Sequence, residues 1–294
     1  MLELNDTTRL TYWLGSITVI NGILLSLTSN SIFGRTIGEI SCQWRVGFSP
    51  HRRTFAIWAV IYTSTFVSCM VQIAGGASQE LPTLSWSTMY FWSSAWNTIT
   101  LWPPIFDREH AYNLGAASVV LIVVTVMACL AIVSERAWRE RSTVAILLTA
   151  PISLLAGWLM VASALNVAIA WKAAFADPAD AIDCGAKTAD MTERDYREKR
   201  RKIFEDDYAR RAKVFSPVPV LLAVLVSGVS VLLPDPLLVV PAMWAIVNQP
   251  FFPSWAYGLS LLLLVVAAVI AGLRAFVFEV EPPEALVQLA SLGT

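Results

Sequence analysis

The chain has 294 residues, of which 56% are hydrophobic and 15% are charged, and its formal net charge is −1. Between clusters of charge lie apolar runs of about 20 residues, the length that spans the hydrocarbon core of a bilayer. This pattern excludes a soluble globular enzyme, a disordered chain and a small disulfide-stabilised secreted module. The near-zero net charge gives no basic field for binding nucleic acid. The sequence therefore predicts a polytopic membrane protein, with the lipid bilayer as its first partner.

Eight apolar segments predict an all-α, polytopic transmembrane helix bundle. In chain order, these segments are residues 10–28, 54–73, 84–102, 114–133, 144–171, 217–233, 237–247 and 256–277. The third segment is rich in Trp, Ser and Thr. The fifth segment is long and contains Pro151 near its start.

The seventh segment, residues 237–247, is short, and it spans a bilayer only if it extends into Asn248-Gln249. It follows Pro234-Asp235-Pro236, which predicts a turn because proline cannot continue the hydrogen-bond ladder of a helix. If the seventh segment enters the membrane without crossing it, the C-terminus lies on the opposite side.

A polar insertion, residues 172–215, interrupts the apolar pattern. Its second half predicts a helix, because Thr192 and Asp195 resemble a capping box and acid-to-base pairs follow at i,i+4 spacing. An apolar stripe at helical spacing includes Tyr196, Ile203, Phe204 and Tyr208. Three interpretations stay open: a solvated surface helix packed on its own bundle, a docking helix for a partner subunit and, third, a helix that binds lipid headgroups.

Ionisable residues are absent from the middle of every predicted span. Proton relays, ion pathways and voltage sensors depend on such groups at membrane depth, so an ion-coupled transporter is not expected. The sequence also lacks the HExxH, CxxC, Gly-rich phosphate-loop and GxSxG patterns of catalytic and metal sites. We therefore expect a protein that is not an enzyme and holds no metal.

Three of the twelve tryptophans, Trp58, Trp96 and Trp158, fall well inside predicted spans. Tryptophans near span ends are explained by the interfacial aromatic belt, but interior indoles need another explanation. They either pack the bundle or line a pocket for a flat apolar ligand, to which each offers a large ring face and one N–H donor. Spacing alone favours packing over a pocket.

Short motifs in several spans resemble those of one family. The second span and its approach contain FSP at residues 48–50 and FAIWAVIY at residues 55–62. SAWN at residues 94–97, GWLMVASALN at residues 157–166 and AMWA at residues 242–245 follow in order. These motifs resemble the translocator protein family, also called tryptophan-rich sensory proteins, and the likeness is clearest in the second and fifth spans.

The resemblance implies a five-helix bundle with a ligand pocket under the first loop. Residues 1–171 would form this core, residues 172–215 the insertion, and residues 216–294 a C-terminal extension of two to three helices. The resemblance places six residues in the pocket: Trp58, Tyr62, Trp96, Asn97, Trp158 and Asn166. The chain departs from the family at His51-Arg52-Arg53, where a Gly usually follows Pro-Ala, and in its long insertion.

Two functions are compatible with these features. The first hypothesis is an accessory, or supernumerary, structural subunit of an organellar bioenergetic complex, expected in the respiratory chain of the mitochondrial inner membrane with other membrane subunits as partners. It rests on the insertion and on the missing catalytic and transport residues. The alternative is a stand-alone translocator-like protein that binds haem, another porphyrin, a sterol or another lipid, as members of the family do. The subunit hypothesis ranks slightly ahead.

Overall fold

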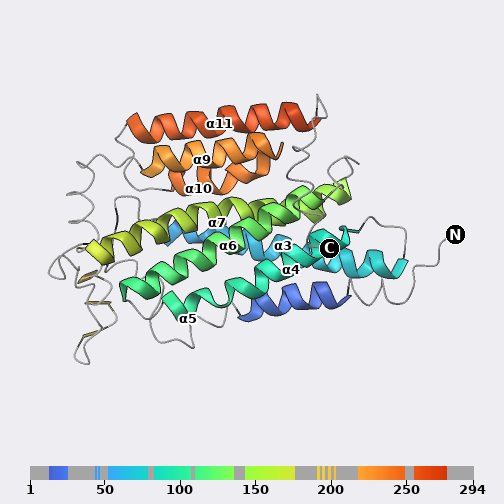
Figure 1. Ribbon diagram of the computed structural model, residues 1–294, viewed down its shortest axis with the longest axis horizontal. Coiled ribbons are helices and arrows are strands. Elements are labelled where there is room, and N and C mark those ends of the chain that lie inside the picture. The colour runs from blue at the N-terminus through green and yellow to red at the C-terminus, as the bar shows by residue number, and fades with distance from the viewer. Residues whose placement is uncertain are drawn as a thin grey trace.

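The computed structural model describes residues 13–25, 44, 46, 52–78, 83–106, 110–135, 143–175, 191–192, 194–195, 198–199, 202, 218–248 and 255–276. Within these ranges the regular elements are helices, and no strand occurs (Figure 1). Four of the helices are long and apolar enough to cross a membrane, and three further apolar helices are shorter. The predicted all-α transmembrane bundle is therefore confirmed.

Each of the eight predicted spans corresponds to a helical element. The core consists of the N-terminal helix Trp13–Leu25, the 3-10 helix η1 (Arg52–Ala56), α3 (Ile57–Ser78), α4 (Trp86–Ile99), the short α5 (Trp102–Phe106), α6 (Ala111–Ser134) and α7 (Thr143–Phe175). The C-terminal part consists of α9 (Val218–Leu232), the 3-10 helix η4 (Pro236–Val239), α10 (Val240–Val247) and α11 (Trp255–Phe276).

The third span ends earlier than the sequence predicts. The prediction extends to residue 102, but α4 ends at Ile99, and the separate helix α5 begins at Trp102. The physical reason is Pro103-Pro104, because neither proline has an N–H to donate to the carbonyl four residues earlier. Proline is tolerated in the first turn of a helix, so the same pair is acceptable near the start of α5.

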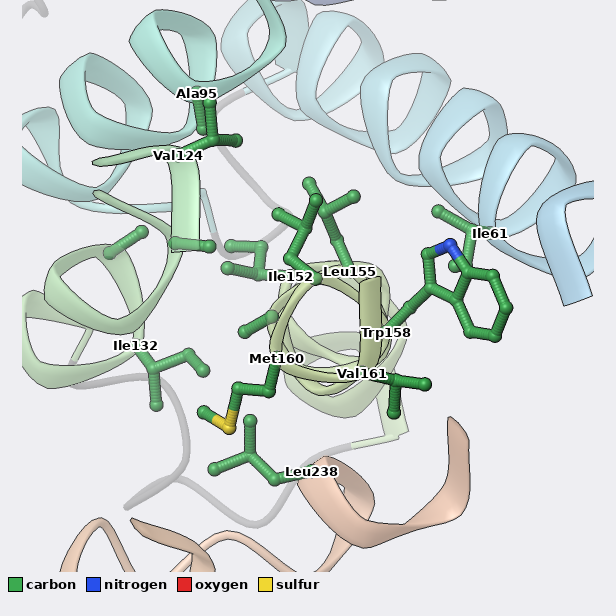
Figure 2. Close-up of a cluster of buried hydrophobic side chains, with 14 of the residues drawn as sticks. Ile61, Ala95, Val124, Ile132, Ile152, Leu155, Trp158, Met160, Val161 and Leu238 are labelled. Atoms are coloured by element: carbon green, nitrogen blue, oxygen red, sulfur yellow. The ribbon is translucent and has the colours of Figure 1, made fainter. Parts of the chain in front are cut away.

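The helix α7 lies at the centre of the packing. Between Pro151 and Val161, every residue except Leu154 is buried. A helix that is apolar on all sides is typically buried on all sides. Figure 2 shows α7 surrounded by side chains from three neighbouring elements, namely Ile61 of α3, Val124 and Ile132 of α6, and Leu238 of η4.

A proline inside α7 lies beside a hydrogen bond from a neighbouring helix. Pro151 has no N–H, so the preceding turn of α7 loses one intrahelical hydrogen bond. Beside this turn, Ser68 Oγ of α3 donates to the Leu148 carbonyl at 3.0 Å. Within a membrane, a hydroxyl from an adjacent helix is a common way to satisfy backbone groups near a proline.

The C-terminal helices form a layer on one side of α7. Figure 1 shows α9 beside α11, with α10 between α9 and α7. Arg274, near the end of α11, donates through Nη1 to the Val231 carbonyl near the end of α9. Basic side chains commonly satisfy the last carbonyls of a helix, so this contact holds the ends of α9 and α11 together.

The seventh predicted span is short, as expected. It consists of four residues of 3-10 helix in η4 and eight residues of α-helix in α10. At the usual rise per residue it is about 20 Å long, whereas the hydrocarbon core is about 30 Å thick. The described helix is therefore too short to cross a bilayer by itself.

The outer faces of the bundle are apolar. On α11 the exposed side chains include Leu262, Val265, Val269 and Leu273, and on α6 they include Val119, Val123 and Val126. Apolar area of this extent on helices long enough to cross a membrane indicates contact with lipid rather than with water.

We predict that Gly22→Ala destabilises the protein, because the N-terminal helix packs closely on α4 at this glycine. A Cβ atom at Gly22 would lie 2.9 Å from the Trp96 carbonyl oxygen. Overpacking costs about 1–3 kcal/mol, which exceeds the gain of at most about 1 kcal/mol from the higher helix propensity of Ala. The measurement is the thermal unfolding midpoint in detergent.

The matched control is Gly115→Ala in α6, where a Cβ atom would meet nothing within 4 Å. This variant keeps only the gain in helix propensity, so its midpoint is expected to stay level or rise. Equal midpoints for the two variants would contradict the close approach at Gly22.

Candidate functional site

Aromatic side chains from four elements meet at one place in the bundle. The rings of Trp58 and Tyr62 in α3 stack, with centroids 5.2 Å apart and planes at 21°. Trp158 of α7 lies edge-on to Trp58 at 6.1 Å and edge-on to Phe55 of η1, also at 6.1 Å. Trp96 of α4 lies 5.7 Å from Tyr62. We call these five residues, Phe55, Trp58, Tyr62, Trp96 and Trp158, the aromatic cluster.

Helix geometry explains why these residues meet. Trp58 and Tyr62 are four positions apart, so their side chains lie on the same face of α3, one turn from each other. The helices α3 and α7 are antiparallel, because Trp58 contacts Trp158 whereas Ser68 bonds to Leu148. The start of α3 therefore meets the middle of α7. All the ring distances lie in the range that is favourable for aromatic pairs.

Two indole N–H groups of the aromatic cluster have no hydrogen-bond acceptor among the described residues. They belong to Trp96, which is 0% exposed, and to Trp158, which is 3% exposed. A buried donor without a partner costs about 1–3 kcal/mol. Trp58 and Tyr62 are only partly buried. The aromatic cluster thus combines two buried donors with two ring systems that are not fully enclosed.

Asn97 lies outside the aromatic cluster. It is exposed, and its Nδ2 donates to the Ser93 carbonyl of its own helix at 2.9 Å. Successive residues of a helix point about 100° apart, so Asn97 cannot share the direction of Trp96. The structure therefore does not bring Asn97 to the other residues that the resemblance implied.

Asn166 belongs to a second group of side chains, two turns along α7 from Trp158. Its Oδ1 accepts a hydrogen bond from Trp102 Nε1 of α5 at 3.0 Å, and its Nδ2 donates to the Ala162 carbonyl at 3.0 Å. Trp102 in turn stacks on Phe106, with centroids 4.9 Å apart. These bonds use both ends of the amide, so Asn166 holds α5 against α7.

The predicted docking residues Tyr196, Ile203, Phe204 and Tyr208 lie outside the described residues. The predicted cap of their segment is present. Thr192 Oγ1 donates to Asp195 Oδ2 at 2.6 Å and accepts from the Asp195 backbone N–H at 3.2 Å. The described residues Arg194, Asp195, Glu198, Lys199 and Lys202 are helical.

The carboxyl group of Asp235 is buried, although the sequence predicted only that this residue belongs to a turn. Asp235 is 1% exposed, accepts from Ser153 Oγ of α7 at 2.5 Å and accepts from the Leu237 backbone N–H at 2.9 Å. Ser230 Oγ donates to the Asp235 carbonyl at 2.6 Å. The sequence did contain a signal for this burial. Two apolar segments flank Pro234-Asp235-Pro236, and both are short for a membrane span.

Residues 12–179 match the model of a family described as TSPO-like protein. The match covers more than half of the chain, from the N-terminal helix to just beyond α7, and includes the whole aromatic cluster. The AMWA motif at residues 242–245 and the helices α9, α10 and α11 lie outside it. No curated protein and no solved structure matches the chain. The apolar helices and the family match together show that the chain is an integral membrane protein and belongs to the TSPO-like protein family.

Proposed function

We propose that the chain is a non-enzymatic, translocator-like membrane protein that binds a flat apolar ligand at the aromatic cluster. The ligand class is a tetrapyrrole, with a sterol as the competing class, because the resemblance to translocator proteins implies these two. The observation that carries the proposal is the pair of buried, unpartnered indole N–H groups of Trp96 and Trp158, beside the rings of Trp58 and Tyr62.

The two indole donors restrict the chemistry of the ligand. An indole N–H donates and does not accept, so the ligand has to present an oxygen or another acceptor. Hydrogen bonds to a charged acceptor are about twice as strong as those between neutral groups. A tetrapyrrole with propionate side chains presents carboxylates at the edge of its ring, whereas a sterol presents one hydroxyl group.

The ring faces of Trp58 and Tyr62 also favour a tetrapyrrole over a sterol. Trp58 and Tyr62 are partly buried and stack at 21°, so a flat ligand would extend this stack from the outer face of one of the two rings. Aromatic pairs contribute about 0.5–1.5 kcal/mol beyond the burial of their area. A conjugated macrocycle gains this stacking contribution, and an aliphatic sterol ring system gains only the burial of apolar area.

We expect Trp158→Phe to weaken the binding of protoporphyrin IX, because phenylalanine keeps an aromatic ring and loses the N–H donor. A hydrogen bond contributes about 0.5–1.5 kcal/mol, which corresponds to an increase in Kd of about 2- to 10-fold. The measurement is the saturable quenching of tryptophan fluorescence by protoporphyrin IX in detergent.

The matched control for this experiment is Trp92→Phe. Trp92 lies on α4, is 0% exposed and also has an unpartnered Nε1, but it is not part of the aromatic cluster. Its Kd is expected to stay within about twofold of the wild-type value, since no ligand bond is lost. Equal effects of the two variants would contradict the role of Trp158, and a wild-type protein without saturable quenching would refute the proposed function.

Trp58→Leu separates the two ligand classes. Leucine keeps apolar area and removes the flat ring. The Kd for protoporphyrin IX is therefore expected to rise about 3- to 10-fold, whereas the Kd for a fluorescent sterol is expected to rise less than about twofold. The measurement is a titration of each ligand, with Trp86→Leu at the exposed start of α4 as the control. Saturable binding of the sterol alone would assign the site to sterols.

A second candidate function is an accessory structural subunit of an organellar bioenergetic complex, in the mitochondrial inner membrane. The part of the chain outside the family match favours it, since α9, α10, α11 and the charged insertion add surface to the translocator-like core.

Native gel electrophoresis in mild detergent tests the subunit function. A subunit is expected to migrate with a large assembly, and replacement of residues 176–217 by a short flexible linker is expected to release it, because the insertion would supply contacts to partners. The control is protoporphyrin IX binding, which this replacement should leave unchanged. Migration of the intact protein as a small free species would contradict the subunit function.

A further inference from the structure

The C-terminal extension contacts the helices that support the aromatic cluster, although it lies outside the residues that match the family. Figure 1 shows α10 directly beside α7, and η4 also packs on α7. We call Pro236–Val247, which comprises η4 and α10, the η4–α10 segment. Three contacts connect this segment and the turn before it to the core.

The first contact holds the start of the segment. Asp235, directly before η4, accepts the hydrogen bond from Ser153 Oγ of α7 at 2.5 Å. The same carboxyl group caps η4 by accepting from the Leu237 backbone N–H. Both groups are buried, so loss of the Ser153 hydroxyl removes the side-chain donor of the carboxyl and leaves it only its backbone donors. The start of η4 is therefore fastened to α7.

The second contact is a close approach of two backbones. A Cβ atom at Gly157 would lie 2.2 Å from the Leu238 carbonyl oxygen and 3.2 Å from Pro241 Cδ. A side chain at position 157 is therefore incompatible with the observed packing. Gly157 directly precedes Trp158, so the η4–α10 segment lies against the turn of α7 that carries this member of the aromatic cluster.

The third contact holds the other end of the segment. Trp244 Nε1 of α10 donates to the Thr54 carbonyl of η1 at 3.0 Å, a contact between residues 190 positions apart in sequence. Thr54 is completely buried and directly precedes Phe55. The ring of Phe55 in turn meets Trp158 edge-on. One end of the segment is thus bonded to α7, and the other end is bonded to η1.

We infer that the η4–α10 segment positions the aromatic cluster, and that Asp235 and Trp244 are positioning residues for ligand binding there. The contact between Phe55 and Trp158 joins η1 to α7, the two elements that the segment bonds to each other. A shift of the segment changes the relative position of these rings. This inference rests on the proposed function and adds to it a dependence on residues that touch no ligand.

The experiment uses the full chain labelled with 5-fluorotryptophan, and it combines fluorine NMR with protoporphyrin IX titration. Loss of one resonance in Trp158→Phe identifies the signal of Trp158. Trp244→Phe removes the donor to Thr54 and keeps an apolar ring. It is expected to shift the Trp158 resonance in the ligand-free protein and to raise Kd about 3- to 10-fold, which corresponds to the loss of about one hydrogen bond.

Two controls separate positioning from general loosening. Trp86→Phe, at an exposed site on α4, is expected to change neither the Trp158 resonance nor Kd. In Trp244→Phe the resonance of Trp102, which bonds to Asn166, is expected to stay in place. A shift of both resonances indicates a loss of overall packing and overturns the positioning role.

Ser153→Ala is the second variant, because it removes only the hydroxyl that bonds to Asp235 and so keeps the test valid if Trp244→Phe does not fold. It is expected to act in the same direction on the resonance and on Kd. Unchanged Trp158 resonance and Kd would overturn the inference. If the wild-type protein binds no protoporphyrin IX, the proposed function fails, and the resonance alone then supports or overturns the positioning role.

Discussion

The burial of α7 is the constraint on which the rest of the structure depends. Inside a membrane, water does not satisfy polar groups, so each polar group of a buried helix needs a partner on another element or on its own helix. For α7 these partners lie on different neighbours: Ser68 of α3 bonds to the Leu148 carbonyl, Asp235 to Ser153, and Trp102 of α5 to Asn166. Each bond fixes one neighbour around α7. The aromatic cluster includes two rings of α3 and one of α7, so its geometry depends on how α3 is held against α7.

The helices were predictable because the thickness of the bilayer sets the length of an apolar run. The predicted second, fourth and fifth spans agree with α3, α6 and α7 to within a few residues. Run length says little about where a helix ends inside an apolar stretch. For that reason the end of α4 at Ile99 and the separate helix α5 escaped prediction, although Pro103-Pro104 contained the information. The burial of Asp235 escaped for a related reason: the two short apolar segments around the turn are a signal for burial, but they do not reveal which side chain packs over it.

The candidate site was predictable to the extent that motifs identify helix faces. Trp58, Tyr62, Trp96 and Trp158 lie together, as the resemblance implied. Asn97 and Asn166 do not join them, because a motif specifies positions in sequence and not the direction of each side chain around a helix. Phe55 completes the aromatic cluster from a short 3-10 turn that precedes the span. The two unpartnered indole donors become visible only in three dimensions, since hydrogen bonding of a tryptophan depends on its neighbours.

The bond between Ser153 and Asp235 joins residues that are 82 positions apart, and it has a consequence for biosynthesis. Where a membrane protein is inserted while it is synthesised, its elements reach the membrane in chain order, and α7 then arrives before η4. During that interval the Ser153–Gly157 face of α7 lacks the contacts to Asp235 and Leu238, and the Ser153 hydroxyl has only the Thr149 carbonyl of its own helix as acceptor. The packing of η4 on α7 therefore follows the insertion of α7 and completes the bundle late. A ribosome that stops before residue 235 leaves a core whose central helix has one open side.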